Sequence, residues 1–294
     1  MISICIPCYN DDPQQLILDL LGQMKLSDAF DEIIVYDDAS SQEVKYPLYD
    51  KVRIIYGDRN VGDFESRKKL AAHAKNERLL FLDADLKLVN ADFLDKYLKS
   101  IDDRSSVIYG GVKYQDERPP DNQLLRWVYG KEREEKLKID SSEIYSSFVA
   151  ASFIVSKSLF EDLTKVFVPN LYGTDLFLSA ELEKRKIEIQ FIKNPVLHLG
   201  LETSMEFLQK SHEVIKATIA MEDLGLIKKN QRPLQRAYLK SKKLGFTIII
   251  YNVLRILKPR LISNLLSSSP RLKYLDLLKL YFFLEAKNKS SAYV

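Results

Sequence analysis

Short apolar runs alternate with longer amphipathic stretches over the first 105 residues. The runs at 2–8, 32–36, 52–56 and 78–82 are largely apolar, which is typical of strands buried in a sheet. Between them, apolar residues recur at helical spacing in the stretches 13–24, 63–75 and 90–101. Strands that alternate with helices predict a mostly parallel sheet with right-handed crossovers. We therefore expect an α/β fold.

The first run contains a proline near its end. Proline has no amide proton to donate, so we expect the strand pairing to stop at Pro7. The residues Tyr9-Asn10-Asp11-Asp12 then form a loop, and Pro13 suits the first position of a helix. The first strand therefore predicts a polar loop at its carboxyl end.

The pattern is less regular after residue 105. It predicts strands at 106–109, 147–155 and 188–192, and helices at 123–138, from 175 and from about 204. We expect one domain over residues 1–220, with a first half at about 1–105 and a second half at about 106–220. Residues 221–294 are expected to form a separate basic, amphipathic, helical region.

Charge is distributed unevenly along the chain. Residues 221–294 hold 15 Lys and Arg against 4 Asp and Glu, whereas the first 220 hold 29 against 37. An acidic body and a basic tail suggest different partners for the two parts. The only cysteines, Cys5 and Cys8, lie in a predicted buried strand, which favours a reducing, cytoplasmic setting. No basic and apolar leader precedes that strand, so we expect no secretory signal.

Acidic residues follow two of the predicted strands. Asp37-Asp38 follows the strand at 32–36, and Asp83-Ala84-Asp85 follows the one at 78–82. The carboxyl ends of parallel strands share the edge at which α/β sheets bind ligands. Carboxylates suit hard cations such as Mg²⁺ and Mn²⁺. On these residues alone, a strand that simply ends in polar side chains is an equal alternative.

Two further polar residues stand at predicted element ends. In Gly173-Thr174-Asp175, Thr174 is placed to cap a helix, and Asp175 lies in its first turn, where the helix dipole favours a carboxylate. His198, one of three histidines, ends the segment Asn194-Pro195-Val196-Leu197-His198.

Together these segments resemble family-2 glycosyltransferases of the GT-A fold. The resemblance covers roughly residues 1–200 and rests on an ordered series of segments: 4–10, 32–40, 60–62 with 66–67, 81–85 and 173–175. Two positions depart from the family pattern. Ala39 replaces the usual glycine, and Thr174 stands where many members have glutamate.

The resemblance implies a role for each matching residue. Asp38 would hydrogen-bond the nucleobase, Pro7 and Tyr9 would line the base pocket, and Arg67 would contact the nucleotide. Asp83 would touch the ribose or the metal region, Asp85 would bind Mn²⁺ or Mg²⁺, His198 would be a further metal ligand, and Asp175 would be the catalytic base.

The implied reaction is inverting transfer of a sugar from a nucleotide-diphospho-sugar, by analogy a UDP-sugar, to a hydroxyl group. The expected acceptor is a glycan or a lipid-linked molecule, in cell-surface polysaccharide or lipopolysaccharide synthesis. We expect no nucleic-acid partner.

Each assignment has a simpler alternative. Asp38 would also suit a turn, Asp175 a helix N-terminus, His198 a half-buried site and Arg67 an exposed surface.

Other functions share parts of the pattern. Phosphatases of the haloacid dehalogenase type also end a strand in Asp-x-Asp, but their motif usually continues to Thr or Val where this chain has Lys87. A sugar nucleotidyltransferase needs a Gly-rich, basic loop after its first strand, and the loop here has no glycine. A catalytically inactive nucleotide-sugar binding module is a third alternative.

The basic tail contains an apolar stretch at 244–251, which Asn252 and Arg255 interrupt. A membrane-spanning helix needs about 20 apolar residues, so this stretch is too short. We predict that the tail lies on the inner face of the membrane, held by apolar burial and by attraction to anionic lipid. Packing on the catalytic domain and contact within a homodimer are equal alternatives.

Overall fold

The computed structural model describes residues 1–41, 49–102, 106–166, 173 and 175–291. The chain forms two compact units. The first comprises Met1–Gln115, Glu134–Asn170 and Glu181–Gly200, and the second comprises Asp116–Arg133, Leu171–Ala180 and Leu201–Val294. The division at residue 220 stays a prediction.

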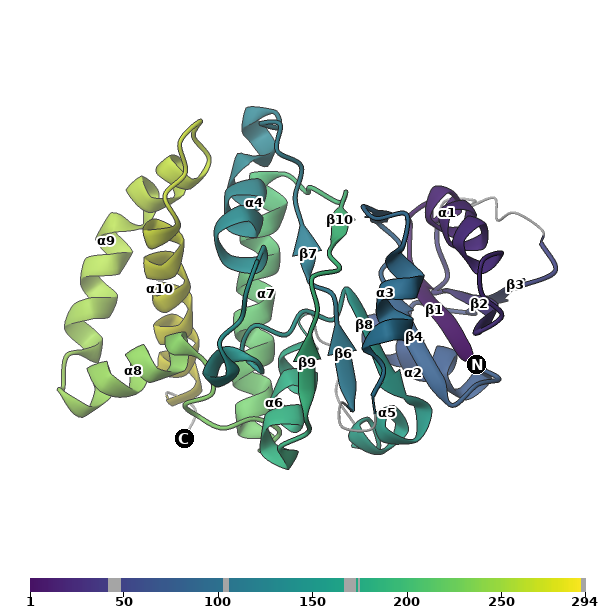
Figure 1. The fold of residues 1–294 in the computed structure, drawn as a ribbon. Coiled ribbons are helices and arrows are strands. Elements are labelled where there is room, and N and C mark those ends of the chain that lie inside the picture. Colours follow the sequence, from purple (N-terminus) through teal and green to yellow (C-terminus); the bar gives the residue numbers. More distant parts are fainter. Residues whose placement is uncertain (42–48, 103–105, 167–172, 174, 292–294) are drawn as a thin grey trace. The chain divides into compact units, whose positions relative to one another are not determined.

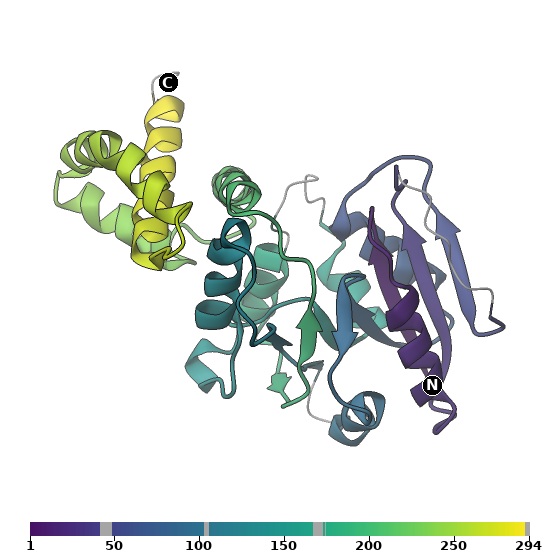
Figure 2. The same ribbon diagram turned by 90° about the horizontal axis from the view of Figure 1, so that it is seen from above.

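A seven-stranded sheet forms the centre of the first unit, in the order β3-β2-β1-β4-β8-β6-β9 (Figures 1 and 2). Its strands are β1 (Ile2–Cys8), β2 (Phe30–Asp37), β3 (Val52–Tyr56), β4 (Arg78–Leu82), β6 (Val107–Tyr109), β8 (Ser152–Ser156) and β9 (Ile189–Phe191). Only β8 runs antiparallel to its neighbours. The predicted α/β fold with a mostly parallel sheet is confirmed.

Helices cover the sheet in two groups. Helix α1 (Gln14–Met24) contacts α3 (Phe93–Ser100), and α2 (Asp63–His73) contacts α5 (Lys157–Leu163). From β1, the chain adds β2 and β3 on one side of β1 and then returns to place β4 on its other side. Because each crossover is right-handed, this reversal puts α1 and α2 on opposite faces of the sheet. Strands β1, β2 and β4 are therefore buried on both sides, as their apolar runs predict.

The prediction that pairing stops at Pro7 is wrong. Strand β1 stays paired with β2 as far as Cys8, whereas its pairing with β4 ends at Cys5. The Cys8 carbonyl accepts a hydrogen bond from the Asp38 amide on the β2 side. Because successive residues of a strand point their polar groups to opposite sides, the missing amide of Pro7 faces the β4 side. Pairing with β4 has already ended at Cys5, so the proline removes no hydrogen bond from the sheet.

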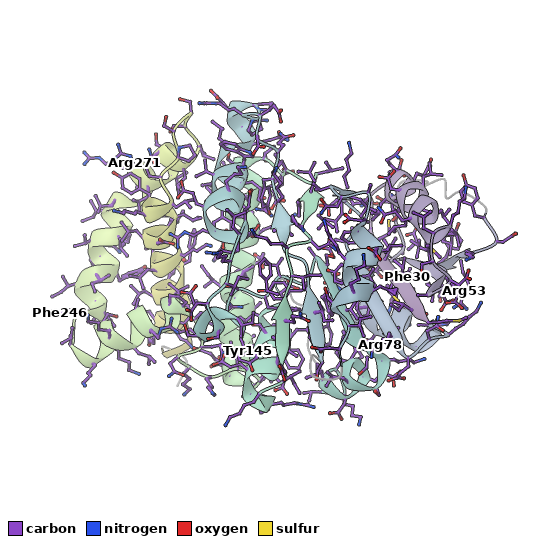
Figure 3. The ribbon with its side chains drawn as sticks, viewed as in Figure 1. Phe30, Arg53, Arg78, Tyr145, Phe246 and Arg271 are labelled. Atoms are coloured by element: carbon purple, nitrogen blue, oxygen red, sulfur yellow. The ribbon has the colours of Figure 1, made fainter. Side chains whose placement is uncertain are left out.

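Parallel strands start at one edge of the sheet and end at the other. Phe30 and Arg78, the first residues of β2 and β4, both lie opposite Ile2 of β1 (Figure 3). The acids that follow β2 and β4 consequently lie at the opposite edge.

A second, three-stranded sheet has the order β5-β10-β7. It consists of β5 (Leu86–Leu88), β10 (Val196–His198) and β7 (Val112–Lys113). Strands β5 and β7 are too short to give a sequence pattern, and the sequence did not predict them. The antiparallel register of β5 and β10 pairs His198 with Leu86.

Two predicted elements are shorter than expected. The helix expected at 123–138 is α4 (Leu124–Tyr129), preceded by a 3₁₀ turn (Asp121–Gln123) and followed by a π-helical segment (Gly130–Glu134). Glycine weakens an α-helix, which fits the change at Gly130. The strand expected at 147–155 begins only at Ser152. Just before it, the Ala151 carbonyl accepts from the Asp83 amide, and the Ala150 carbonyl accepts from the Arg67 side chain.

Helices make up most of the second unit. They include α7 (Ser204–Asp223), α8 (Pro233–Lys243), α9 (Thr247–Leu265) and α10 (Leu272–Ser291). Helix α10 contacts α7, α8 and α9, and leucines such as Leu261, Leu265 and Leu278 are buried between them. The predicted helical character of the C-terminal region is confirmed. In the described part of the chain, no helix combines the length and apolarity that crossing a bilayer requires.

Candidate active site

Two polar loops meet at the carboxyl ends of β1 and β2. The side-chain oxygen of Asn10 accepts hydrogen bonds from the Ser41 backbone amide and hydroxyl. The backbone amide of Asn10 donates to the Ser40 hydroxyl. Ala39 has a φ of 59°, in the left-handed region. An L-residue costs about 1–2 kcal/mol there, which explains why glycine suits this position better. The loop keeps this shape although Ala39 replaces the glycine.

Asp38 is buried at this edge. Its two carboxylate oxygens accept hydrogen bonds from the amides of Val61 and Gly62, at 2.8 and 2.7 Å. The carboxylate thus fixes the segment that precedes α2. A carboxylate has about four acceptor positions, so two backbone bonds leave capacity for a ligand. Burial, and then the negative charge of Asp38, raise the pKa of Tyr36.

Arg67 is 3% exposed, so the alternative of a plain surface cation is wrong. Its guanidinium forms ion pairs with Asp63 and with Asp83, the latter at 2.6 Å, and donates to the Ala150 carbonyl at 3.1 Å. Helix α2 brings Arg67 under the end of β4 in this way. A charge-assisted contact of this kind fixes the Asp83 carboxylate, whose side chain is 30% exposed.

Asp85 and His198 come together although they are 113 positions apart in the sequence. The Asp85 carbonyl accepts from the Leu199 amide at 2.9 Å, next to the β5–β10 pairing. The Asp85 carboxylate then lies 3.6 Å from Nε2 of His198, with both side chains partly exposed. The prediction that these two residues are neighbours rested on the family resemblance. The structure provides the local cause, which is the short second sheet.

Gly200 leaves the space that this pair occupies. A Cβ atom at Gly200 would lie 2.1 Å from the Asp85 carboxylate and 3.3 Å from the His198 ring. Tyr114, fully buried, stacks on the His198 ring at 5.6 Å between centroids, and its hydroxyl hydrogen-bonds Glu134. Sequence reasoning missed Gly200 and Tyr114. The one available signal was a glycine two residues after His198.

The Asp85–His198 pair fits a divalent cation by its chemistry. Carboxylate oxygen suits Mg²⁺ and Mn²⁺, and imidazole nitrogen is a common ligand of transition metals. The two groups lie 3.6 Å apart, so that both could contact one bound cation. Within the described residues, no three acidic, histidine or cysteine side chains form a complete metal site.

The other predicted residues are placed as follows. Pro7 is buried in β1, and Tyr9 follows it with a 46% exposed side chain. Asp175 is the first residue of α6 (Asp175–Arg185) and is partly exposed. Thr174, the predicted cap, lies outside the described residues. The nucleotide, metal and base roles of all these residues stay predictions.

Comparison with known proteins adds a family and a fold. A sequence model of the family described as Glycosyl transferase family 2 matches residues 3–163. Among curated proteins, no significant match to the sequence is found.

Two solved structures share the fold. TarS 1-349 of S. aureus is 16% identical, with a TM-score of 0.51 over 98% of this chain and 91% of that one. The mannosyltransferase PcManGT of Pyrobaculum calidifontis, in complex with GDP-Man and Mn²⁺, is 13% identical, with a TM-score of 0.52 over 75% of this chain and 64% of that one. At these identities, the likeness concerns the fold alone.

Proposed function

The chain belongs to glycosyl transferase family 2, and from this premise we propose that it moves a sugar from a nucleotide-diphospho-sugar to a hydroxyl group with inversion. It is an enzyme with the GT-A fold. Family membership also removes the phosphatase alternative, because Asp83 then has no nucleophilic role to fill.

Asp85 and His198 would hold the divalent cation, Mn²⁺ or Mg²⁺. When bound, the cation stabilises the charge that builds on a departing diphosphate. The observation that carries this proposal is the Asp85–His198 pair beside the end of β4, in the space left by Gly200. A solved neighbour with the same fold is complexed with Mn²⁺, which supports a divalent metal here.

The nucleotide would lie along the polar edge formed after β1, β2 and β4. Asp38 would bond the base, and Pro7 and Tyr9 would line its pocket, with the exposed Tyr9 ring available for stacking. Asp83 would meet the ribose or the metal region. Because Arg67 is buried next to Asp83, its main role in this proposal is to hold the Asp83 carboxylate in place. Direct contact of Arg67 with the nucleotide would be secondary.

Asp175 would remove the proton from the acceptor hydroxyl as it attacks. A positioned carboxylate base contributes typically about 10²–10⁴-fold to the rate. Direct displacement by the acceptor needs one base and gives inversion. We propose a glycan or lipid-linked acceptor, for synthesis of cell-surface polysaccharide or lipopolysaccharide, on the cytoplasmic side of the membrane.

Thermal unfolding with nucleotides and Mn²⁺ tests the donor half of this proposal. A ligand of the native state at a hundredfold excess over Kd contributes about 2.7 kcal/mol, which raises the unfolding temperature by about 5 °C. We expect this rise with UDP or GDP only when Mn²⁺ is present. UDP follows from the family resemblance, and GDP is included because a solved neighbour binds GDP-Man.

Asp85→Asn should remove the Mn²⁺-dependent part of the rise. Asp95→Asn is the matched control, since Asp95 is an exposed aspartate of the same unit that forms an ion pair with Lys99. Absence of any metal-dependent rise in the unmodified protein contradicts the proposal. An inactive binding module would give the rise without turnover, so release of nucleotide from a nucleotide-sugar separates the two.

A further inference from the structure

Helix α9 carries apolar residues on two faces, and only one of them is packed. Leu254, Leu261 and Leu265 are buried against α10. The other face presents Ile249, Val253 and Ile256, which follow the three- and four-residue spacing of one helical stripe. Ile249 is 59% and Ile256 75% exposed. Exposed isoleucines in a stripe are unusual, since helices normally bury such faces.

The turn before α9 extends this stripe. Gly245 has a φ of 74° and closes α8, with its amide bonded to the Lys242 carbonyl. The residues on either side of it, Leu244 and Phe246, are both about half exposed. Figure 3 labels Phe246, which directly precedes α9, and Arg271, which directly precedes α10. Leu244, Phe246, Ile248, Ile249, Val253 and Ile256 are called the α9 apolar face below.

Basic residues surround the α9 apolar face. Between Asp223 and Asp276 the chain holds twelve Lys and Arg and no acidic residue. Lys240, Lys242 and Lys243 are exposed in the last turn of α8, and Arg255 and Arg260 are exposed on α9 itself. Arg260 continues the stripe of Ile249, Val253 and Ile256 by one more turn.

We propose that the α9 apolar face binds an anionic lipid bilayer, with its isoleucines and Phe246 in the headgroup boundary and its lysines and arginines on lipid phosphates. Apolar burial and attraction to anionic lipid together hold interfacial helices. This proposal concerns the second unit by itself and stands or falls separately from the proposed reaction.

The charge pattern argues against a second copy as the occupant. A symmetric dimer would place the same basic patch on both sides of the contact. The twelve basic residues of this stretch, which holds no acidic residue, would then repel across the interface. An anionic surface is complementary to the same pattern, which is why we choose it.

Sedimentation with vesicles tests the proposal on the full chain. We expect binding to vesicles of phosphatidylglycerol and phosphatidylcholine in equal amounts, and none to phosphatidylcholine alone. Ile249→Asp combined with Ile256→Asp should lower the partition coefficient at least about tenfold. Lys242→Glu and Lys243→Glu should each lower it about fivefold or more, the factor for one charge at an anionic surface, and added salt should weaken binding.

Leu26→Asp is the matched control, because Leu26 is an exposed leucine outside the α9 apolar face, at 83%. It should leave vesicle binding unchanged. All the substituted positions are exposed, so unfolding temperatures should stay within a few degrees of the unmodified protein. No binding by the unmodified protein, or equal binding by the double aspartate variant, overturns the proposal. Self-association without vesicles that the double variant abolishes would assign the face to a second copy instead.

Discussion

The two units use apolar residues in different ways. In the first unit, β1, β2 and β4 bury their apolar runs completely, because helices cover both faces of the sheet. In the second unit, α9 has one apolar face in the core and another in solvent. An apolar run in a central strand therefore predicts that both faces of the strand are covered. An apolar helix face does not by itself predict which element or partner covers it.

Charge separates the units as well. The acids at the strand ends of the first unit have specific neighbours, as in Arg67–Asp83 and Asp85–His198. The basic residues between Asp223 and Asp276 have no acidic residue in their own stretch. Ion pairs within the first unit fix the positions of its carboxylates, as catalysis requires. An excess of positive charge in the second unit instead attracts an external surface of negative charge.

The largest expected effect concerns Asp175, the proposed base, which belongs to the second unit. Asp175→Asn should lower the turnover number by about 10²–10⁴-fold, because the amide cannot take the acceptor proton. Nucleotide-sugar binding, measured by calorimetry with Mn²⁺, should stay nearly unchanged.

Asp85→Asn gives the opposite pattern and serves as the comparison, since it should weaken Mn²⁺-dependent binding itself. If Asp175→Asn retains turnover, the base assignment is wrong, while the metal assignment at Asp85 is unaffected.

The next effect compares the two faces of α9. Leu261→Ala should lower the free energy of unfolding by about 2–5 kcal/mol, because Leu261 is 4% exposed and its truncation leaves a cavity. Ile256→Ala should change it by no more than about 0.5 kcal/mol, since that side chain lies in solvent. Urea unfolding of both variants measures the difference. Equal losses would mean that the α9 apolar face is packed in solution.

Much of the first unit could be predicted from the sequence. The strands at 32–36 and 78–82 correspond to β2 and β4, because a buried strand is a local apolar run. The run at 52–56 corresponds to β3, an edge strand that is only partly buried. The acids that follow β2 and β4 were predicted from the same two apolar runs. The family and its fold also followed, since the ordered motifs lie in these loops.

The rest depends on contacts between distant residues. Strands β5 and β7 exist because β10 pairs with them, and Leu86–Leu88 alone has no strand pattern. Burial of Arg67 depends on the Ala150 carbonyl, 83 positions away. Pro7 continues its strand because of the side of the sheet that its missing amide faces. Sequence reasoning has no access to such pairings.

A smaller effect tests how tightly the first unit holds its acids. Gly200→Ala places a Cβ atom 2.1 Å from the Asp85 carboxylate, so the carboxylate must move. We expect Mn²⁺ affinity to fall about 10–100-fold, as for other changes that reorient a metal ligand. Gly22→Ala is the control, because no atom lies within 4 Å of a Cβ atom there. Unchanged Mn²⁺ affinity in Gly200→Ala would exclude Asp85 as a ligand.

The smallest effect concerns how helices begin in the two units. The N-cap residue of α2 in the first unit is Gly62, which has no side chain to cap the helix. Helix α7 of the second unit begins with a capping box of Thr203 and Glu206. Thr203→Ala should lower the free energy of unfolding by about 1 kcal/mol, because it removes the acceptor for the Glu206 amide. Thr203→Ser keeps the hydroxyl and should keep the stability. Urea unfolding of the two variants measures this difference.

The same cap predicts a dependence on pH. The side-chain and then the backbone hydrogen bond from Thr203 lower the pKa of Glu206 below its usual 4.5. A carboxyl group whose pKa is lower in the folded state stabilises the fold above its unfolded pKa and loses this contribution as the pH falls through the folded value. The loss from Thr203→Ala should therefore be larger at pH 7 than at pH 3. A loss of equal size at both pH values would mean that the Glu206 carboxylate contributes nothing to the start of α7.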